Sequence, residues 1–208
     1  MSFTRMSRCH ISVVALSAML ALGGCAFSTR NSTLIYPPAP DPGLVAQAHA
    51  AAPPAPKDIT IALAPFEDKR ADTTNVGTVR NGFGMKTAPV KAANSVTTWV
   101  NHAVKVELSN AGYAVIPESE ATDSSVLLTG SVDTVYADAY FEYGGKVSLL
   151  VNLSRGGREL LSRTYRGNGS AGTNWSATAK SYSQSLALAL ADALKQMVVD
   201  VDKALQPE

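Results

Sequence analysis

Apolar and polar residues alternate over three neighbouring stretches in the second half of the chain, at 125–136, 146–154 and 159–166. Such alternation is typical of β-strands with one buried face. The last two stretches are separated by a turn sequence that contains Gly156 and Gly157, and paired glycines favour a tight turn. We therefore predict three consecutive antiparallel strands.

Two other stretches carry apolar residues at helical spacing. The first follows a candidate N-cap, Asn94 or Ser95, and ends at Gly112. The second begins at Ser181-Tyr-Ser-Gln, which has the form of a capping box, and its apolar residues recur every three or four positions as far as Leu205. Both patterns predict a helix with one apolar face that packs on a sheet. For the second helix, the alternative is that its apolar face lies on a membrane or binds a partner.

The remaining segments of the domain complete the predicted fold. Residues 59–65 have the pattern of a buried strand, residues 113–116 form a short strand, and residues 66–93 are predicted to be a long irregular loop. We therefore predict an α+β two-layer domain over residues 58–208. Its sheet is expected to be mixed and mostly antiparallel, in the order β-α-β-β-β-β, with both helices on one face and a long C-terminal helix.

The first 24 residues have the features of a secretory signal peptide. Arg5 and Arg8 precede an apolar run that is too short to cross a bilayer as a helix. Residues 22–25, Leu-Gly-Gly-Cys, resemble the bacterial lipobox, at which diacylglycerol is added to the cysteine thiol. We predict that Cys25 is the lipidated N-terminus of the mature chain. The alternative is an ordinary signal peptide or an uncleaved anchor, with a cysteine there by chance.

Residues 25–57 are rich in proline and alanine, which predicts a linker between the lipid and the domain. At about 3.1 Å per residue in a polyproline conformation, thirty such residues would span roughly 100 Å. A proline-rich partner motif is the alternative, although the sequence is too generic to favour it.

Composition excludes several classes of function. Removing the signal peptide leaves 16 basic and 17 acidic residues, a net charge of −1, so no nucleic-acid partner is expected. Cys9 leaves with the signal peptide and Cys25 carries the lipid, so no disulfide is predicted. Only His49 and His102 remain as histidines, and we predict no metal and no cofactor besides the covalent lipid.

The sequence also lacks catalytic motifs. None of its serines stands in a nucleophile-elbow sequence, and His102 has no nucleophile that a motif identifies. The glycine-rich segment 80–86 lacks the third glycine of a dinucleotide fingerprint, since Thr87 stands there. The chain is therefore predicted not to be an enzyme.

A charged turn follows the first predicted strand and contains Asp68 and Arg70. Loops at the carboxyl ends of strands often bind ligands, and the planar guanidinium of Arg70 can hold a carboxylate or a phosphate. The alternative is a solvated turn whose charges pair with one another.

Two further candidate sites contain aromatic residues. Arg80 and Phe83 lie in the glycine-rich segment, which can contact a partner protein or be a simple flap. Tyr140 and Phe141 belong to an aromatic cluster between two predicted strands, which can stack on sugar rings or anchor an interface. Cross-strand packing is the alternative for this cluster.

The lipobox, the Asp-Lys-Arg turn at 68–70, the helix that ends at Gly112 and the Ala-Gly-Tyr-Ala-Val sequence at 111–115 resemble the YajG-like family of bacterial lipoproteins. The resemblance spans roughly residues 57–205, and the chain departs from the family in its longer linker and its additional glycines near Gly156 and Gly167. It implies an envelope lipoprotein with an α+β fold, and it assigns no site residues.

Similarity to other lipoproteins further implies transfer to the periplasmic face of the outer membrane, because Ala26 rather than aspartate follows Cys25. Two functions are then open. The protein is either an adaptor that docks on another envelope protein through a sheet edge or the Gly82 loop, or a module that binds a cell-wall or lipid-like ligand. The adaptor is favoured, because the sequence shows neither a deep apolar pocket nor a convergent set of polar residues.

Overall fold

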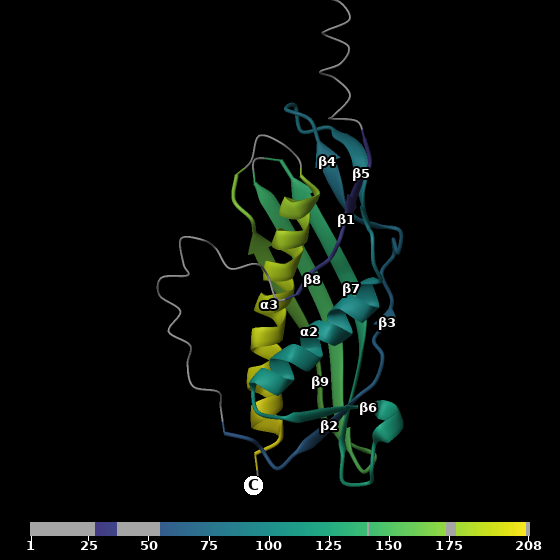
Figure 1. The fold of residues 1–208 in the computed structure, drawn as a ribbon, viewed down its shortest axis with the longest axis vertical. Helices are drawn as coiled ribbons and strands as arrows, with labels where there is room; N and C mark the ends of the chain where they lie inside the picture. Colours follow the sequence, from purple (N-terminus) through teal and green to yellow (C-terminus); the bar gives the residue numbers. More distant parts are fainter. Residues whose placement is uncertain (1–27, 37–54, 141, 174–177, 207–208) are drawn as a thin grey trace, which may run out of the picture.

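A computed structural model describes residues 28–36, 55–140, 142–173 and 178–206, which form a sheet of nine strands with two α-helices (Figure 1). The α+β class is confirmed. The helices are α2 (Val96–Asn110) and α3 (Ala179–Ala204), and a short 3-10 helix spans Glu118–Glu120. The strands are β1 (Arg30–Ser32), β2 (Thr60–Leu63), β3 (Glu67–Asp68), β4 (Asn75–Arg80), β5 (Lys86–Ala92), β6 (Ala114–Pro117), β7 (Val126–Ala139), β8 (Tyr143–Arg155) and β9 (Arg158–Ser170).

Strand β7 is the centre of the sheet. One of its edges pairs along its length with β8, which pairs in turn with β9, and this confirms the predicted meander. Its other edge is shared by three short strands: β2 pairs at 126–128, β3 at 131–132 and β4 at 137–139. Beyond them, β6 pairs with β2, and β5 and then β1 extend the sheet from β4.

The prediction of a mostly antiparallel sheet is wrong. Of the eight strand pairings among the described residues, five are parallel, and only β4–β5, β7–β8 and β8–β9 are antiparallel. Parallel neighbours are joined by long connections that leave no turn motif in the sequence, whereas antiparallel neighbours can be joined by a short, recognisable turn. The sequence therefore revealed the antiparallel β7–β8–β9 meander and none of the parallel pairings.

Residues 66–93 are not the irregular loop that was predicted. They contain β3 and a hairpin of β4 and β5, with the glycine-rich segment as its turn. Glycine and proline within these strands, at Gly77 and Pro89, interrupt the apolar alternation by which strands are recognised. The observed order is therefore five strands, a helix, four strands and a helix, rather than β-α-β-β-β-β.

The predicted linker 25–57 contains a part of the folded domain. Strand β1 pairs in parallel with β5, with Arg30 opposite Val90. Leu34 and Tyr36 are buried in the core, and the Tyr36 hydroxyl donates a 2.6 Å hydrogen bond to Glu107 of α2. The proline content of the region masked this short apolar segment. Residues 25–27, which include Cys25, and residues 37–54 lie outside the described residues.

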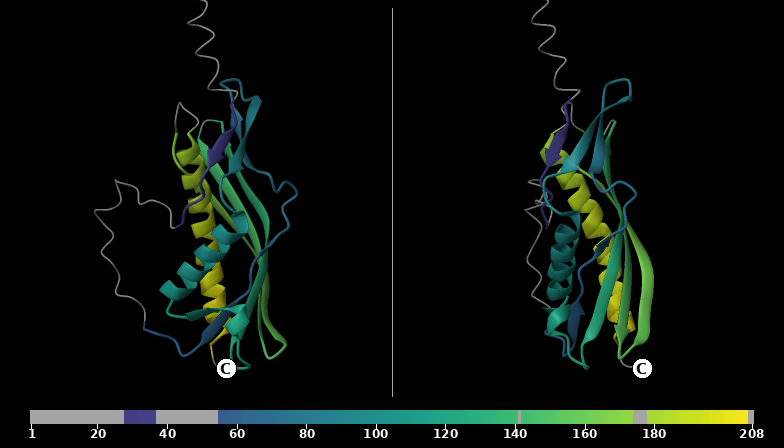
Figure 2. Two further views of the ribbon diagram at one scale, coloured as in Figure 1. Left: turned by 45° about the vertical axis from the view of Figure 1, so that its right-hand side comes forward. Right: turned by 90° about the vertical axis from the view of Figure 1, so that its right-hand side faces the viewer.

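Both helices cover the same face of the sheet, as predicted (Figure 2). Ser95 is the N-cap of α2, and its hydroxyl accepts a hydrogen bond from Thr98 N. The predicted N-cap of α3, Ser181, is wrong. The N-cap is Thr178, three residues earlier, and its hydroxyl accepts a hydrogen bond from Ser181 N.

Neither described helix is long and apolar enough to cross a membrane. The apolar stripe of α3 is core, as predicted, with buried Leu186, Leu190, Leu194, Met197 and Val201.

The backbone of α3 lies directly on β8 and β9. Gly145 and Gly169 face Ser185 and Ala189, and a Cβ at Gly145 would lie 2.5 Å from the carbonyl carbon of Ser185. At Gly167 a Cβ would overlap the carbonyl oxygen of Ala189. Small residues on both sides therefore permit this close approach.

Candidate functional site

The charged turn after β2 contains an ion pair between two of its own residues, Asp68 and Arg70. The guanidinium of Arg70 grips the Asp68 carboxylate with two hydrogen bonds, from Nε to Oδ1 at 2.9 Å and from an Nη to Oδ2 at 2.8 Å. Two further N–H groups donate to the carbonyls of Thr73 and Asn75, at 3.0 and 3.3 Å. The Arg70 side chain is only 4% exposed. Its donors therefore hold the turn together, and they do not face solvent as a ligand site would require.

The electrostatics of this turn agree with that role. The hydrogen bonds from Arg70 lower the pKa of the Asp68 carboxyl, against the opposing effect of burial. Asp72 accepts from the backbone and side chain of Asn75, and these bonds lower its pKa as well. Both carboxylates are thus stabilised in their charged form by groups of the same turn.

Arg80 forms a second bidentate pair at the end of β4. Its Nε and an Nη donate to the two carboxylate oxygens of Asp138 on β7, at 2.7 and 2.6 Å, and the other Nη donates to Gly84 O at 2.7 Å. The pair raises the pKa of Arg80. Arg80 therefore fastens the β4–β5 turn to the neighbouring strand.

The turn itself is held by Asn81. Its Oδ1 accepts hydrogen bonds from Phe83 N and Met85 N, both at 3.0 Å, and its backbone N–H donates to Met85 O. Gly84 has a φ of 80°, which favours glycine. The aromatic ring of Tyr140 lies against Gly84, where an added Cβ would be 2.6 Å from Cε2 of Tyr140. The conformation of the turn is therefore held by hydrogen bonds to Asn81 and by the contact between Gly84 and Tyr140.

This ordered turn exposes apolar side chains. Phe83 is 87% exposed, Met85 60% and Tyr140 52%. We call these three residues the apolar tip. Of the predicted site residues, the structure brings Arg80, Phe83 and Tyr140 together at this end. Asp68 and Arg70 lie away from it, with Asp68 paired to Val132 beside the middle of β7. Phe141, which was predicted with Tyr140, lies outside the described residues.

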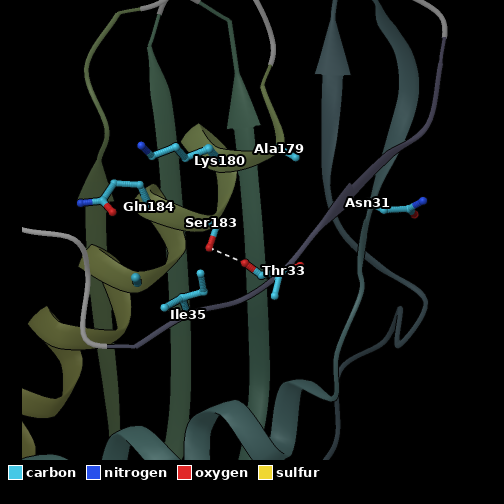
Figure 3. A pocket seen from close by; sticks show the side chains of 8 residues that line it. Asn31, Thr33, Ile35, Ala179, Lys180, Ser183 and Gln184 are labelled. Carbon is cyan, nitrogen blue, oxygen red and sulfur yellow. Dashed lines mark hydrogen bonds between the residues drawn. The ribbon is translucent and has the colours of Figure 1, made fainter.

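A shallow groove of about 280 Å³ lies between the β1 segment and the start of α3 (Figure 3). Ser183 closes its floor with a 2.7 Å hydrogen bond to Thr33 O. Lys180 and Gln184 line the helix side, and the exposed Ile35 lies opposite. The described residues contain no cluster of histidine, cysteine, aspartate or glutamate that could hold a metal ion.

Sequence reasoning missed the position of β1 relative to the apolar tip. Strands β1 and β5 are parallel, so residues before Arg30 run toward the same end of the molecule as residues before Val90. Figure 1 shows β1 beside β4 and β5 at that end. The apolar run at 34–36, ahead of the first prolines, was the available signal for a docked segment.

The match to known families now defines the class of protein. A model of a family described as uncharacterized lipoproteins, Lipoprotein_16, matches residues 46–206. The chain belongs to this YajG-like lipoprotein family, which confirms the resemblance seen in the sequence. Membership implies a lipid anchor in a membrane of the cell envelope. No curated protein matches the sequence significantly.

A solved structure shares the fold at low sequence identity. The protein XCC0632 from Xanthomonas campestris is 15% identical, with a TM-score of 0.55, over 86% of this chain and 99% of that chain. Looser similarity extends to lipoprotein GNA1162 from Neisseria meningitidis, 15% identical over 70% of this chain and 96% of that chain, with a TM-score of 0.37. PelC from Paraburkholderia phytofirmans, crystallised as a dodecamer, is 14% identical over 69% and 94%, with a TM-score of 0.39.

Proposed function

We propose that the protein is a non-catalytic adaptor of an envelope assembly, anchored through lipid on Cys25 to the periplasmic face of the outer membrane. Family membership supports the lipid anchor, and the lipobox supports Cys25 as its site. Ala26 after the cysteine supports the outer membrane. The adaptor role is carried by one structural observation, the composition of the open face of the sheet.

The open face is the side of β7, β8 and β9 that α2 and α3 do not cover (Figure 2). Residues directly opposite one another on these strands share a face, so the ladder register defines its rows. One row consists of Ser131, Leu150 and Thr164, and the next of Thr129, Asn152 and Ser162. Leu150 is half-buried at the centre of this surface.

These two rows contain no charged side chain. A solvent-facing sheet commonly carries lysine and glutamate, and the cores of protein interfaces are depleted in charge. The hydroxyl groups of Thr129, Ser162 and Thr164 surround the half-buried Leu150 with small side chains against which another protein can pack, whereas Ser131 is buried and its hydroxyl donates to Asp133.

Charged side chains flank these two rows on the same face, with Arg166 opposite Ser148 on one side and Glu159 opposite Ser154 on the other. A partner that covers Leu150 would therefore make uncharged contacts at the centre of the interface and meet charges at its rim.

A photocrosslinking amino acid at Thr164 tests this function in cells. We expect it to capture one envelope protein, and the same residue at Lys195, exposed on α3 on the helix side, to capture none. Leu150→Arg should lower the yield at Thr164 about tenfold or more, because central apolar contacts dominate interfaces. Equal capture from both positions, or full capture with Leu150→Arg, would contradict the proposal.

A lipid-like ligand in the groove is the second candidate function. It is favoured by the groove's apolar side chains, Ile35, Ala179 and Ala187, with the Lys180 ammonium among its lining residues. A fluorescent fatty acid titrated into soluble Cys25→Ser protein should bind, and Ile35→Asp should weaken that binding. Ile35 is 62% exposed, so its substitution leaves the core intact. Unchanged binding in this variant would exclude the groove.

A further inference from the structure

The described residues expose five large hydrophobic side chains, and three of them form the apolar tip. Clustered exposed apolar groups mark sites of interaction, whereas scattered ones are ordinary. Phe83 and Met85 are presented by a turn whose backbone is fixed by Asn81 and whose base is fixed by Arg80. The tip is therefore a preformed apolar projection at one end of the molecule.

The strand register places the anchor at that end. Arg30 of β1 is opposite Val90 of β5, and the two strands are parallel. Cys25 precedes Arg30 by five residues, and Met85 precedes Val90 by the same five residues. Five residues span at most about 18 Å. The lipid on Cys25 therefore cannot be far from the end of the domain that carries the apolar tip.

We propose that the apolar tip inserts into the interfacial region of the same bilayer that holds the lipid on Cys25. The inference rests on the proposed lipidation of Cys25, and it adds a second membrane contact. The acyl chains retain the protein, and the tip sets the orientation of the domain. Side chains of this kind, a phenylalanine, a methionine and a tyrosine, suit the boundary between headgroups and acyl chains.

Charges near the tip are compatible with this position. The carboxylate of Asp138 is neutralised by Arg80, and Lys86, exposed directly after Met85, can approach anionic headgroups. Glu142, which lies at the same end, accepts a hydrogen bond from Ser170. A bilayer is favoured over a protein partner for the tip, because the short path from Cys25 to Arg30 keeps this end close to the membrane surface.

A probe on the turn tests the insertion. The mature lipidated chain has no other cysteine, so Gly82→Cys can be labelled selectively with the fluorophore NBD. A Cβ added at Gly82 would meet no atom within 4 Å. The matched control is Glu159→Cys, exposed at the far end of the sheet, where Glu159 is opposite Ser154 and Ser154 opposite Leu127. Both proteins are reconstituted on vesicles of phosphatidylethanolamine and phosphatidylglycerol that contain doxyl-labelled lipid.

We expect a blue shift and strong quenching for the probe at Gly82 and solvent-like emission at Glu159. The double substitution Phe83→Ser, Met85→Ser keeps the backbone bonds to Asn81, and it should abolish most of the quenching while the protein stays on the vesicles. Solvent-like emission at Gly82 in vesicle-bound protein would overturn the inference and leave the anchor intact. Quenching that survives the double substitution would overturn it too. Loss of vesicle binding in Cys25→Ser reports on the anchor alone.

Discussion

Two arginines show how pairing decides the role of a charged residue. Arg70 and Arg80 were both recognised in the sequence as candidates for binding, and in the structure each grips an aspartate with two hydrogen bonds. The pair of Arg70 with Asp68 is local, and mutual pairing in this turn was the stated alternative. The pair of Arg80 with Asp138 joins residues 58 positions apart. Sequence reasoning could identify the residues, but only the sheet topology shows their partners.

The Asp68–Arg70 pair predicts a pH-dependent contribution to stability. Asp68→Asn leaves the buried Arg70 guanidinium without its counter-charge, and we expect it to lower the free energy of unfolding by about 2 kcal/mol at neutral pH. The pKa of Asp68 is lowered in the folded state, so its contribution is complete above the unfolded value of about 4 and is lost as the pH falls through the folded value.

Urea denaturation at neutral pH and at successively lower pH checks this prediction. The difference between the wild type and Asp68→Asn should shrink as the pH falls below about 4. Lys69→Gln is the matched control, because the Lys69–Glu67 pair in the same turn is largely exposed and should contribute little. A difference that stays constant down to acidic pH would contradict the assigned role of the charge.

At the scale of elements, periodicity and turn motifs determined what could be predicted. The two helices and the β7–β8–β9 meander have long, regular patterns, and all were predicted with boundaries within a few residues. The β4–β5 hairpin was missed because Gly77 and Pro89 break its alternation. Strand β1 was missed because three residues are too few for a pattern and because prolines follow closely. Its pairing with β5 depends on contacts across 60 positions.

The close contact between α3 and the sheet predicts different effects for alanine substitutions at two adjacent glycines, Gly144 and Gly145. A Cβ at Gly145 would lie 2.5 Å from the Ser185 carbonyl carbon, whereas a Cβ at Gly144 would have only an ordinary contact, 3.9 Å from Asp138 O. We expect Gly145→Ala to lower the free energy of unfolding by about 3 kcal/mol, because α3 must move away from β8. Gly144→Ala should change it by less than about 1 kcal/mol. Thermal denaturation of the two variants measures the contrast, and similar melting temperatures would refute it.

The packing of the β1 segment against the domain predicts different effects for substitutions at two adjacent residues. Leu34 is 3% exposed and its neighbour Ile35 is 62% exposed. If residues 28–36 belong to the domain, Leu34→Ala should lower the free energy of unfolding by about 2–4 kcal/mol, and Ile35→Ala should have little effect. Chemical denaturation of the mature protein provides the measurement. A free linker at this position would make both substitutions neutral.

For the whole molecule, the position of β1 changes the relation between domain and membrane. The sequence suggested that residues 25–57 form one arm that lets the domain stand far from the bilayer. With β1 in the sheet, the lipid proposed on Cys25 would be separated from the domain only by the few residues before Arg30, and residues 37–54 connect two parts of the domain. Strand β7, with 14 residues at about 3.3 Å each, extends roughly 45 Å from the end that carries the apolar tip toward the opposite end of the domain.

This arrangement predicts that insertions at two places in the former linker have different effects. A glycine-serine segment of about 20 residues between Ala26 and Phe27 lengthens the path to the membrane, by roughly 25 Å in root-mean-square terms. It should reduce quenching of a probe at Gly82 by doxyl lipid, because the local concentration of the tip at the bilayer falls. The same segment between His49 and Ala50 lengthens only a connection within the domain, and quenching should not change. Both variants must first be shown to melt like the wild type. If residues 25–57 were instead one continuous tether, the two insertions would reduce the quenching equally, because each would add the same length between the lipid and the folded domain.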